Sequence, residues 1–230
     1  MIWHFCTPKS ASTYLKNLFI DQNFSVVSAI PFYKNRPQVS DFNELYKNLL
    51  SFDLKKEIFT SHQHALFDEH LSQYISEKHK VIIQTRNIYE TICSLRDQIV
   101  HENIYEKNPF CILNKDMSIY ELNKKIILNY TPFHVNFIIS WYNSKIEAEK
   151  IFINYKDFIN NEKNTFKIIF NQNNFGFKDE DLEKLKKTSR YFSGLERKID
   201  LSKSEILLCD DIVKTLTSGY NQEINNIIYQ

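Results

Sequence analysis

Short apolar segments and longer amphipathic segments alternate along the chain. The short segments are rich in β-branched and aromatic residues, which is typical of buried strands. The longer segments repeat apolar residues three and four positions apart, as in helices that cover one side of a core. Strands are predicted at 2–6, 25–30, 57–61, 80–85 and 151–155. Helices are predicted near 12–23, 41–50, 66–78, 89–104, 118–128, 131–148, 157–171, 179–187 and 202–217. This alternation predicts an α/β fold with a central parallel sheet of about five strands flanked by helices.

Composition narrows the class of protein. At 230 residues, with 43% hydrophobic and 14% aromatic residues, the chain is expected to form one ordered domain over residues 1–230. A net charge of +1 argues against nucleic acid as a partner, because nucleic-acid binding needs a clustered basic face. Neither a signal peptide nor a long apolar run is recognised, so a cytoplasmic protein that does not contact the membrane is expected. The four cysteines lack metal-ligand spacing, so no metal site is expected. We expect buried, reduced thiols instead.

The first candidate site is the turn after the strand 2–6. It runs Thr-Pro-Lys-Ser-Ala-Ser-Thr and leads directly into an amphipathic helix. Backbone N–H groups at a helix N-terminus bind anions, and a lysine and hydroxyl groups add donors. The turn is not a Walker A loop, because no glycine occurs before Gly176 and Lys9 precedes the hydroxyl residues. It therefore predicts a phosphate site of another type.

Two more candidate sites follow other predicted strands. Arg86 comes directly after the strand 80–85, and Ser94 lies eight residues later in the next helix. An arginine there offers two parallel donors to a phosphate. His62 ends the strand 57–61, and its usual pKa suits proton abstraction near neutral pH. Carboxyl ends of parallel strands share one edge of a sheet, so Lys9, His62 and Arg86 are expected along the same edge.

These three segments resemble the motifs of sulfotransferases that use 3′-phosphoadenosine 5′-phosphosulfate (PAPS), a family with a P-loop-like fold. The turn P-K-S-A-S-T-Y-L is similar to the family's 5′-phosphosulfate loop, with Ala11 in place of its usual glycine. R-N-I-Y-E-T-I-C-S is similar to the 3′-phosphate motif, and T-S-H to the strand that carries the family's base. The late family motif is poorly kept, and whether Arg190, Arg197 or Lys198 completes the 3′-phosphate site stays open.

The resemblance implies a role for each matched residue. The 5′-phosphate would be held by the loop residues Lys9, Ser10, Ala11, Ser12 and Thr13, with Tyr14 near the adenine. Arg86 and Ser94 would hold the 3′-phosphate. Lys9 would also stabilise the leaving group in catalysis, and His62 would be the general base, with His64 or a carboxylate as the alternatives. The acceptor would be a small molecule or a glycan, and the product nucleotide adenosine 3′,5′-bisphosphate (PAP).

Two other functions are compatible with the sequence. One is a P-loop-type kinase, which the missing Walker A glycines and the lack of a clear magnesium-binding aspartate disfavour. The other is a binding protein that keeps the sulfotransferase fold without activity. The oligomeric state is left open by the sequence.

Overall fold

The computed structural model describes residues 1–21, 24–27, 58–60, 63–105, 113–170 and 199–230. They fall into two compact units. One unit, here the sheet unit, comprises Met1–Cys6, Ser10–Thr85 and Lys145–Leu195. The other, the helical unit, comprises Thr7–Lys9, Arg86–Ser144 and Glu196–Gln230. No helix among the described residues is long and apolar enough to cross a membrane.

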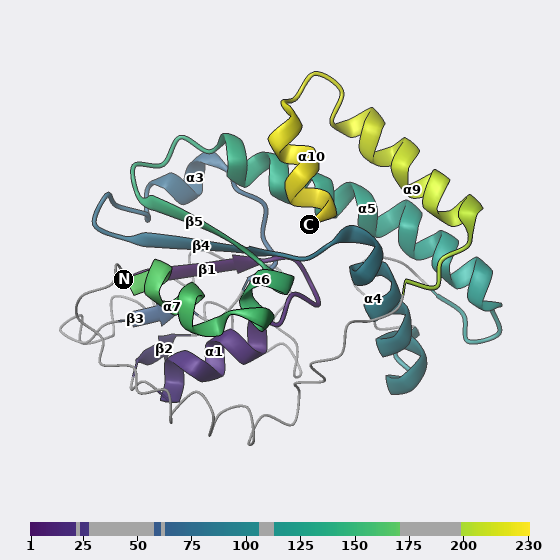
Figure 1. Cartoon of the computed structure of the whole chain (residues 1–230), viewed down its shortest axis with the longest axis horizontal. Coiled ribbons are helices and arrows are strands. Elements are labelled where there is room, and N and C mark those ends of the chain that lie inside the picture. Colours follow the sequence, from purple (N-terminus) through teal and green to yellow (C-terminus); the bar gives the residue numbers. More distant parts are fainter. Residues whose placement is uncertain (22–23, 28–57, 61–62, 106–112, 171–198) are drawn as a thin grey trace. The chain divides into compact units, whose positions relative to one another are not determined.

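The sheet unit is built on a parallel sheet in the order β2-β3-β1-β4-β5 (Figure 1). Three of its strands are long: β1 (Ile2–Cys6), β4 (Lys80–Thr85) and β5 (Glu149–Asn154). The other two, β2 (Ser25–Val27) and β3 (Ile58–Thr60), have three residues each. Every pairing is parallel. The α/β class and the parallel sheet predicted from the sequence are therefore confirmed.

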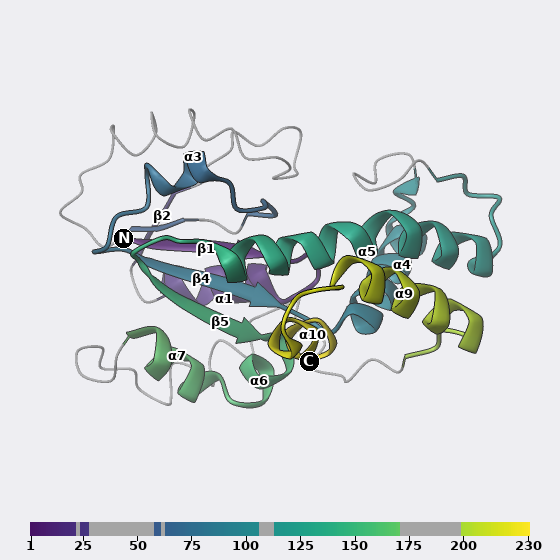
Figure 2. The ribbon, with the colours of Figure 1, turned by 90° about the horizontal axis from the view of Figure 1, so that it is seen from above.

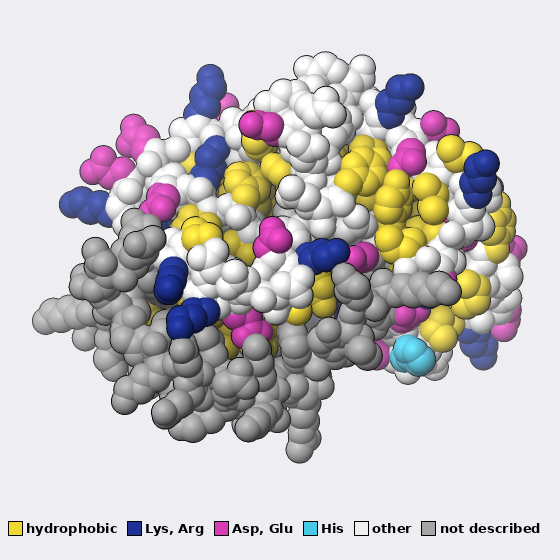
Figure 3. All heavy atoms as spheres, viewed as in Figure 1, with side chains coloured by type: hydrophobic (Ala, Val, Ile, Leu, Met, Phe, Trp, Pro, Cys, Tyr) yellow, Lys and Arg dark blue, Asp and Glu magenta, His cyan; other side chains and the backbone are white. Residues whose placement is uncertain are grey.

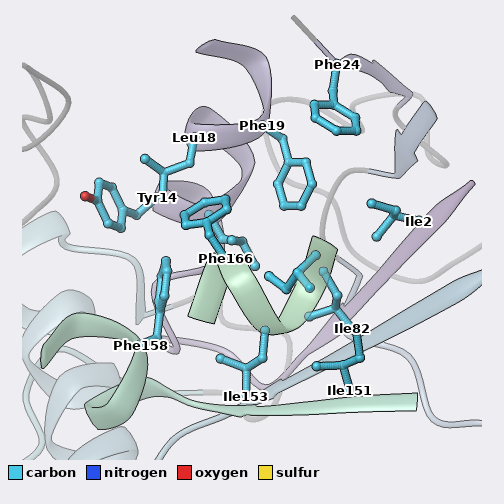
Figure 4. Close-up of a cluster of buried hydrophobic side chains, with 12 residues drawn as sticks. Ile2, Tyr14, Leu18, Phe19, Phe24, Ile82, Ile151, Ile153, Phe158 and Phe166 are labelled. Carbon is cyan, nitrogen blue, oxygen red and sulfur yellow. The ribbon is translucent and has the colours of Figure 1, made fainter. Parts of the chain in front are cut away.

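Three helices pack on one face of this sheet: α1 (Ser12–Asp21), α6 (Tyr155–Asn160) and α7 (Glu162–Phe170) (Figures 1 and 2). Their aromatic side chains meet isoleucines of β1, β4 and β5 in one apolar cluster (Figure 4). Phe19 and Phe158 are fully buried there. Because side chains alternate along a strand, Ile2, His4 and Cys6 of β1 share one face, and Trp3 and Phe5 take the other. The polar His4 and the thiol of Cys6 thus point to the side of α1.

The helical unit consists of α4 (Ile88–Glu102), α5 (Ile119–Asn143), α9 (Lys203–Leu216) and α10 (Gln222–Tyr229). α5 packs against the other three, and α10 also contacts α4. Figure 3 shows hydrophobic side chains at the surface over these helices, and Tyr120, Leu128 and Leu207 are among the exposed ones. None of these belongs to a predicted site.

Several helix predictions were wrong in their bounds. The segment predicted at 66–78 holds only the short α3 (Glu69–Ser72), followed by turns. The segments 118–128 and 131–148 are one helix, α5, with Pro132 inside it. Proline removes the hydrogen bond to the carbonyl of Leu128, and Leu128 lies on an exposed side where water can solvate that carbonyl.

Of the remaining helix predictions, one is corrected, one helix was missed, and two lie outside the described residues. The helix predicted at 157–171 is two helices, α6 and α7, which separate at Asn161 (φ −146°). α10 was not predicted at all. The helices predicted at 41–50 and 179–187 lie outside the described residues.

Candidate functional site

The turn between β1 and α1 has an unusual backbone. Lys9 and Ala11 both have φ of 65°, in the left-handed region that favours glycine. Ala11 accepts the first hydrogen bond of α1, from the Leu15 N–H at 3.1 Å. The position where the family motif has glycine therefore does adopt a conformation that glycine favours, with a Cβ present.

A buried chain of side chains holds the Ser10 end of this turn. The Gln84 side-chain amide donates to the Ser10 carbonyl oxygen at 2.6 Å. The Gln84 carbonyl oxygen lies 2.8 Å from His4 Nε2, which must therefore carry a proton. His4, Ser10 and Gln84 are all fully buried. Burial lowers the pKa of His4 to about 3, although its bond to Gln84 acts in the opposite direction. The hydrogen-bonded group of His4, Gln84 and Ser10 is therefore neutral near pH 7.

A second contact, within the helical unit, holds the Lys9 carbonyl. Arg86 Nη1 donates to this oxygen at 3.0 Å, and Arg86 Nε donates to Glu90 Oε2 at 2.9 Å. In a trans peptide the C=O and the next N–H point in opposite directions. The N–H groups of Ser10 and Ala11 therefore point away from the side chains that hold the Lys9 and Ser10 carbonyls. Such an arrangement presents backbone N–H groups to an anion.

The serine hydroxyls of the turn face inward. Ser12 and Ser10 hydrogen-bond to the thiol of Cys6. Burial raises the pKa of Cys6 to about 12 despite these bonds, so the thiol stays protonated. Cys6, Cys93 and Cys209 are free and buried, which confirms the expected reduced thiols for Cys6 and Cys93.

Tyr14 belongs to the core of the sheet unit. Its ring is 4% exposed and lies 5.7 Å from the ring of Phe158, and its hydroxyl donates to Glu162 Oε1 at 2.9 Å (Figure 4). A ring in this position cannot stack on an adenine. The role expected for Tyr14 is therefore corrected to a structural one.

The segment after β3 brings His64 to the end of β1. The Cys6 N–H donates to the Gln63 carbonyl at 2.9 Å, and the Gln63 N–H donates to the His4 carbonyl at 3.0 Å. His64 Nδ1 lies 2.8 Å from the Cys6 carbonyl oxygen. A carbonyl only accepts, so Nδ1 carries the proton and Nε2 is the basic nitrogen of the neutral ring. Burial lowers the pKa of His64, against the effect of this bond, which keeps the ring neutral at pH 7. His62 lies outside the described residues.

The start of α4 carries the Arg86 side of the candidate site. Asn87 caps the helix through bonds from the Tyr89 and Glu90 N–H groups. Arg86 is 4% exposed, and its guanidinium is oriented by Glu90 and the Lys9 carbonyl. Ser94 lies one helical repeat beyond Glu90 and is buried. The candidate residues Arg190, Arg197 and Lys198 lie outside the described residues.

The structure adds residues that the sequence analysis passed over. Gln84 and His4 are polar residues inside apolar strands, which was a readable signal of a buried network. Asp210 of α9 and Tyr229 of α10 contact Tyr89 and Asn87 at the start of α4, and these contacts between distant parts of the sequence left no signal in it. In the described part of the chain, no cluster of three or more His, Cys, Asp or Glu side chains is placed to hold a metal ion.

Comparison with known proteins gives a structural likeness and no sequence relative. No family model matches the chain, and no curated protein matches it. Among solved structures, mouse sulfotransferase SULT7A1 complexed with PAP is similar, with a TM-score of 0.66 and 13% identity over all of this chain and 88% of that one. The YorR protein of Bacillus subtilis, in complex with phosphorylated GDP, has a TM-score of 0.41 and 7% identity over 74% of this chain and 94% of that one. The chain therefore has a fold similar to that of a sulfotransferase.

Proposed function

We propose that the protein is a sulfotransferase that moves the sulfuryl group of PAPS to an acceptor hydroxyl or amine. The observation that carries the proposal is the turn at Lys9–Ala11. Its carbonyls are held by Arg86 and Gln84, so its N–H groups face the other way, as a bound 5′-phosphate requires. The matched motifs and the likeness to a sulfotransferase in complex with PAP support the choice of this nucleotide.

In this proposal the residues of the chain position the reactants and balance charge. The turn's N–H groups and Lys9 hold the 5′-phosphate, and Arg86 with Ser94 holds the 3′-phosphate. A new S–O or S–N bond forms to the acceptor while the S–O bond to the 5′-phosphate oxygen breaks. Lys9 neutralises the charge that grows on that leaving oxygen. A histidine takes the acceptor's proton.

Both histidines remain candidates for this base. His62 matches the family motif, and His64 has the required tautomer, with its Nδ1 proton held by the Cys6 carbonyl. Nε2 of His64 is then the atom that accepts a proton. No metal takes part in the proposed mechanism.

The direct test of the donor is the affinity for PAP relative to AMP, which lacks the 3′-phosphate. Loss of a charge-assisted bond to phosphate costs about 1.5–3 kcal/mol, so Arg86→Ala should weaken PAP binding at least about tenfold more than it weakens AMP binding. Glu90→Gln removes the ion pair and keeps the guanidinium, so it separates the orientation of Arg86 from the presence of its charge. Titration calorimetry measures all six affinities, for wild type and the two variants.

Two results would contradict the proposal. Equal loss of PAP and AMP binding in Arg86→Ala would assign Arg86 to support of the Lys9 carbonyl alone. A wild-type protein that binds both nucleotides equally would remove the 3′-phosphate site. Sulfate transfer from PAPS to a panel of phenols, amines and sugars then tests the activity itself.

A further inference from the structure

The last turn of α10 contacts the residue that follows Arg86. Asn87 Nδ2 donates to the Tyr229 carbonyl oxygen at 2.6 Å. The Oδ1 atom of the same side chain accepts from the N–H groups of Tyr89 at 2.9 Å and Glu90 at 3.2 Å. One amide side chain therefore connects the end of α10 with the first turn of α4.

A shared carboxylate strengthens this junction. The hydroxyls of Tyr89 and Tyr229 both donate to Asp210 Oδ1 of α9, the latter at 2.9 Å. Their rings pack with centroids 5.5 Å apart. Desolvation raises the pKa of both tyrosines, so both remain donors over the working pH range. Hydrogen bonds to a charged acceptor are stronger than neutral ones, and here two of them join α4, α9 and α10.

The junction extends to the arginine that the proposed 3′-phosphate site needs. Asn87 is bonded directly to Arg86 in the chain, and it caps Glu90. Glu90 in turn accepts from Arg86 Nε at 2.9 Å. Tyr229 orients Asn87, Asn87 holds Glu90, and Glu90 orients the guanidinium.

We propose that α10 positions Arg86 for the 3′-phosphate, with Asn87 and Tyr229 as positioning residues. This inference rests on the proposed function. It makes preference for PAP over AMP depend on a helix that carries none of the predicted ligand-binding residues.

Two variants test the contact between α10 and α4. Asn87→Ser keeps an N-cap oxygen of similar strength but loses the donor to Tyr229. Tyr229→Ala removes the ring and hydroxyl that hold the end of α10. Each should reduce the ratio of PAP affinity to AMP affinity about fivefold, the effect of losing one neutral hydrogen bond. Tyr229→Phe keeps the ring packing but loses the bond to Asp210, so its ratio should fall between those of wild type and Tyr229→Ala.

Tyr142→Phe is the matched control at the other end of α10. The Tyr142 hydroxyl hydrogen-bonds to Glu223 in the first turn of α10, whereas Asn87 contacts the last turn of α10. It should leave the PAP to AMP ratio unchanged. An equal fall in Tyr142→Phe and Tyr229→Ala would overturn the inference, because general loosening of α10 would explain both. An unchanged ratio in Asn87→Ser and Tyr229→Ala would also overturn it.

Hydrogen exchange separates this inference from the proposed function. The amides of residues 88–91 should exchange faster in Tyr229→Ala and remain protected in Tyr142→Phe. If wild type shows no preference for PAP, the proposed function fails, and this exchange pattern alone decides whether α10 positions the Arg86–Glu90 segment. Unchanged exchange in Tyr229→Ala would overturn the positioning role in either case.

Discussion

The two turns that carry the predicted anion-binding residues are held by different kinds of contacts. The carbonyl of Ser10 is held by Gln84 and, behind it, His4, which are neutral and fully buried. The start of α4 is held by the ion pair of Arg86 with Glu90 and by the Asp210 carboxylate, which accepts from two tyrosines. Glu90 of that second region is 18% exposed.

The difference separates two ways to prepare a phosphate site. A neutral buried network fixes backbone geometry without adding charge, and it is not screened by salt. Losing one member is costly, because the partner is left buried without a hydrogen bond. A charged and partly exposed network fixes the position of side chains and also contributes an electric field at the site, and salt weakens this field. We therefore expect substitutions in the buried network at Ser10 to lower the stability of the fold. Substitutions at the start of α4 should instead lower the selectivity between nucleotides.

The largest effect is expected at one of the two histidines that come after β3 in the sequence, His62 or His64. General-base catalysis contributes roughly 10²–10⁴-fold, so alanine at the true base should lower kcat by at least about 100-fold and remove the acidic limb of the pH–rate profile. His62→Ala and His64→Ala are compared by steady-state kinetics, with circular dichroism as the folding control. If neither variant loses activity, the base is a carboxylate or the reaction is a different one.

Lys9→Ala should have the next largest effect, and it separates catalysis from support of the turn. The variant keeps the Lys9 carbonyl that Arg86 holds, so the turn should persist. Loss of one electrostatic stabiliser costs roughly 10²–10³-fold in kcat, with a smaller change in donor affinity. Lys124→Ala, at an exposed position of α5, is the charge-matched control. Unchanged kcat in Lys9→Ala would exclude the lysine from the mechanism.

Gln84→Leu tests the buried network directly. It leaves His4 Nε2 and the Ser10 carbonyl buried without Gln84, which should lower the free energy of unfolding by about 2–5 kcal/mol in urea denaturation. The double variant His4→Phe with Gln84→Leu should recover part of this stability while nucleotide affinity stays low. A double variant no more stable than Gln84→Leu would show that the bond to His4 does not stabilise the fold.

Acid should destabilise the protein through one histidine in each unit. Burial lowers the pKa of both His4 and His134 to about 3. Their contribution is complete above the unfolded value near 6.5 and is lost as pH falls toward 3, at up to about 1.4 kcal/mol per pH unit for each. His4→Gln should reduce this slope by up to about 1.4 kcal/mol per pH unit between pH 6 and 4.

The smallest effect is expected at Ala11. An alanine in the left-handed region costs roughly 1–2 kcal/mol. Glycine avoids this cost but loses about 0.4–1 kcal/mol, because it gives the unfolded chain more conformational entropy. Ala11→Gly should therefore stabilise the protein by up to about 1 kcal/mol. Ala11→Val should destabilise it, because a β-branched residue fits this region poorly. A destabilised Ala11→Gly variant would show that the left-handed conformation does not persist in solution.

The sequence predicted the strands well because their signals are local, since apolar runs such as 80–85 can only be buried. The binding roles of Lys9 and Arg86 stay predictions. Tyr14 was misjudged because an aromatic side chain at a helix start suits either a ligand or a core. Pro132 was misjudged because its tolerance depends on where the Leu128 carbonyl points. Contacts such as Asn87 with Tyr229 join residues far apart in sequence and leave no periodic signal.

Lys9 and Ala11 show that this turn is defined by its dihedral angles and not by its residue types. The chain has only three glycines, and it reaches the left-handed region here with side chains that usually avoid it. A pattern search that demands glycine at such a loop will miss chains of this kind. A search for consecutive carbonyls that accept hydrogen bonds from side chains at the end of a neighbouring strand, with a left-handed residue before the helix, would find them.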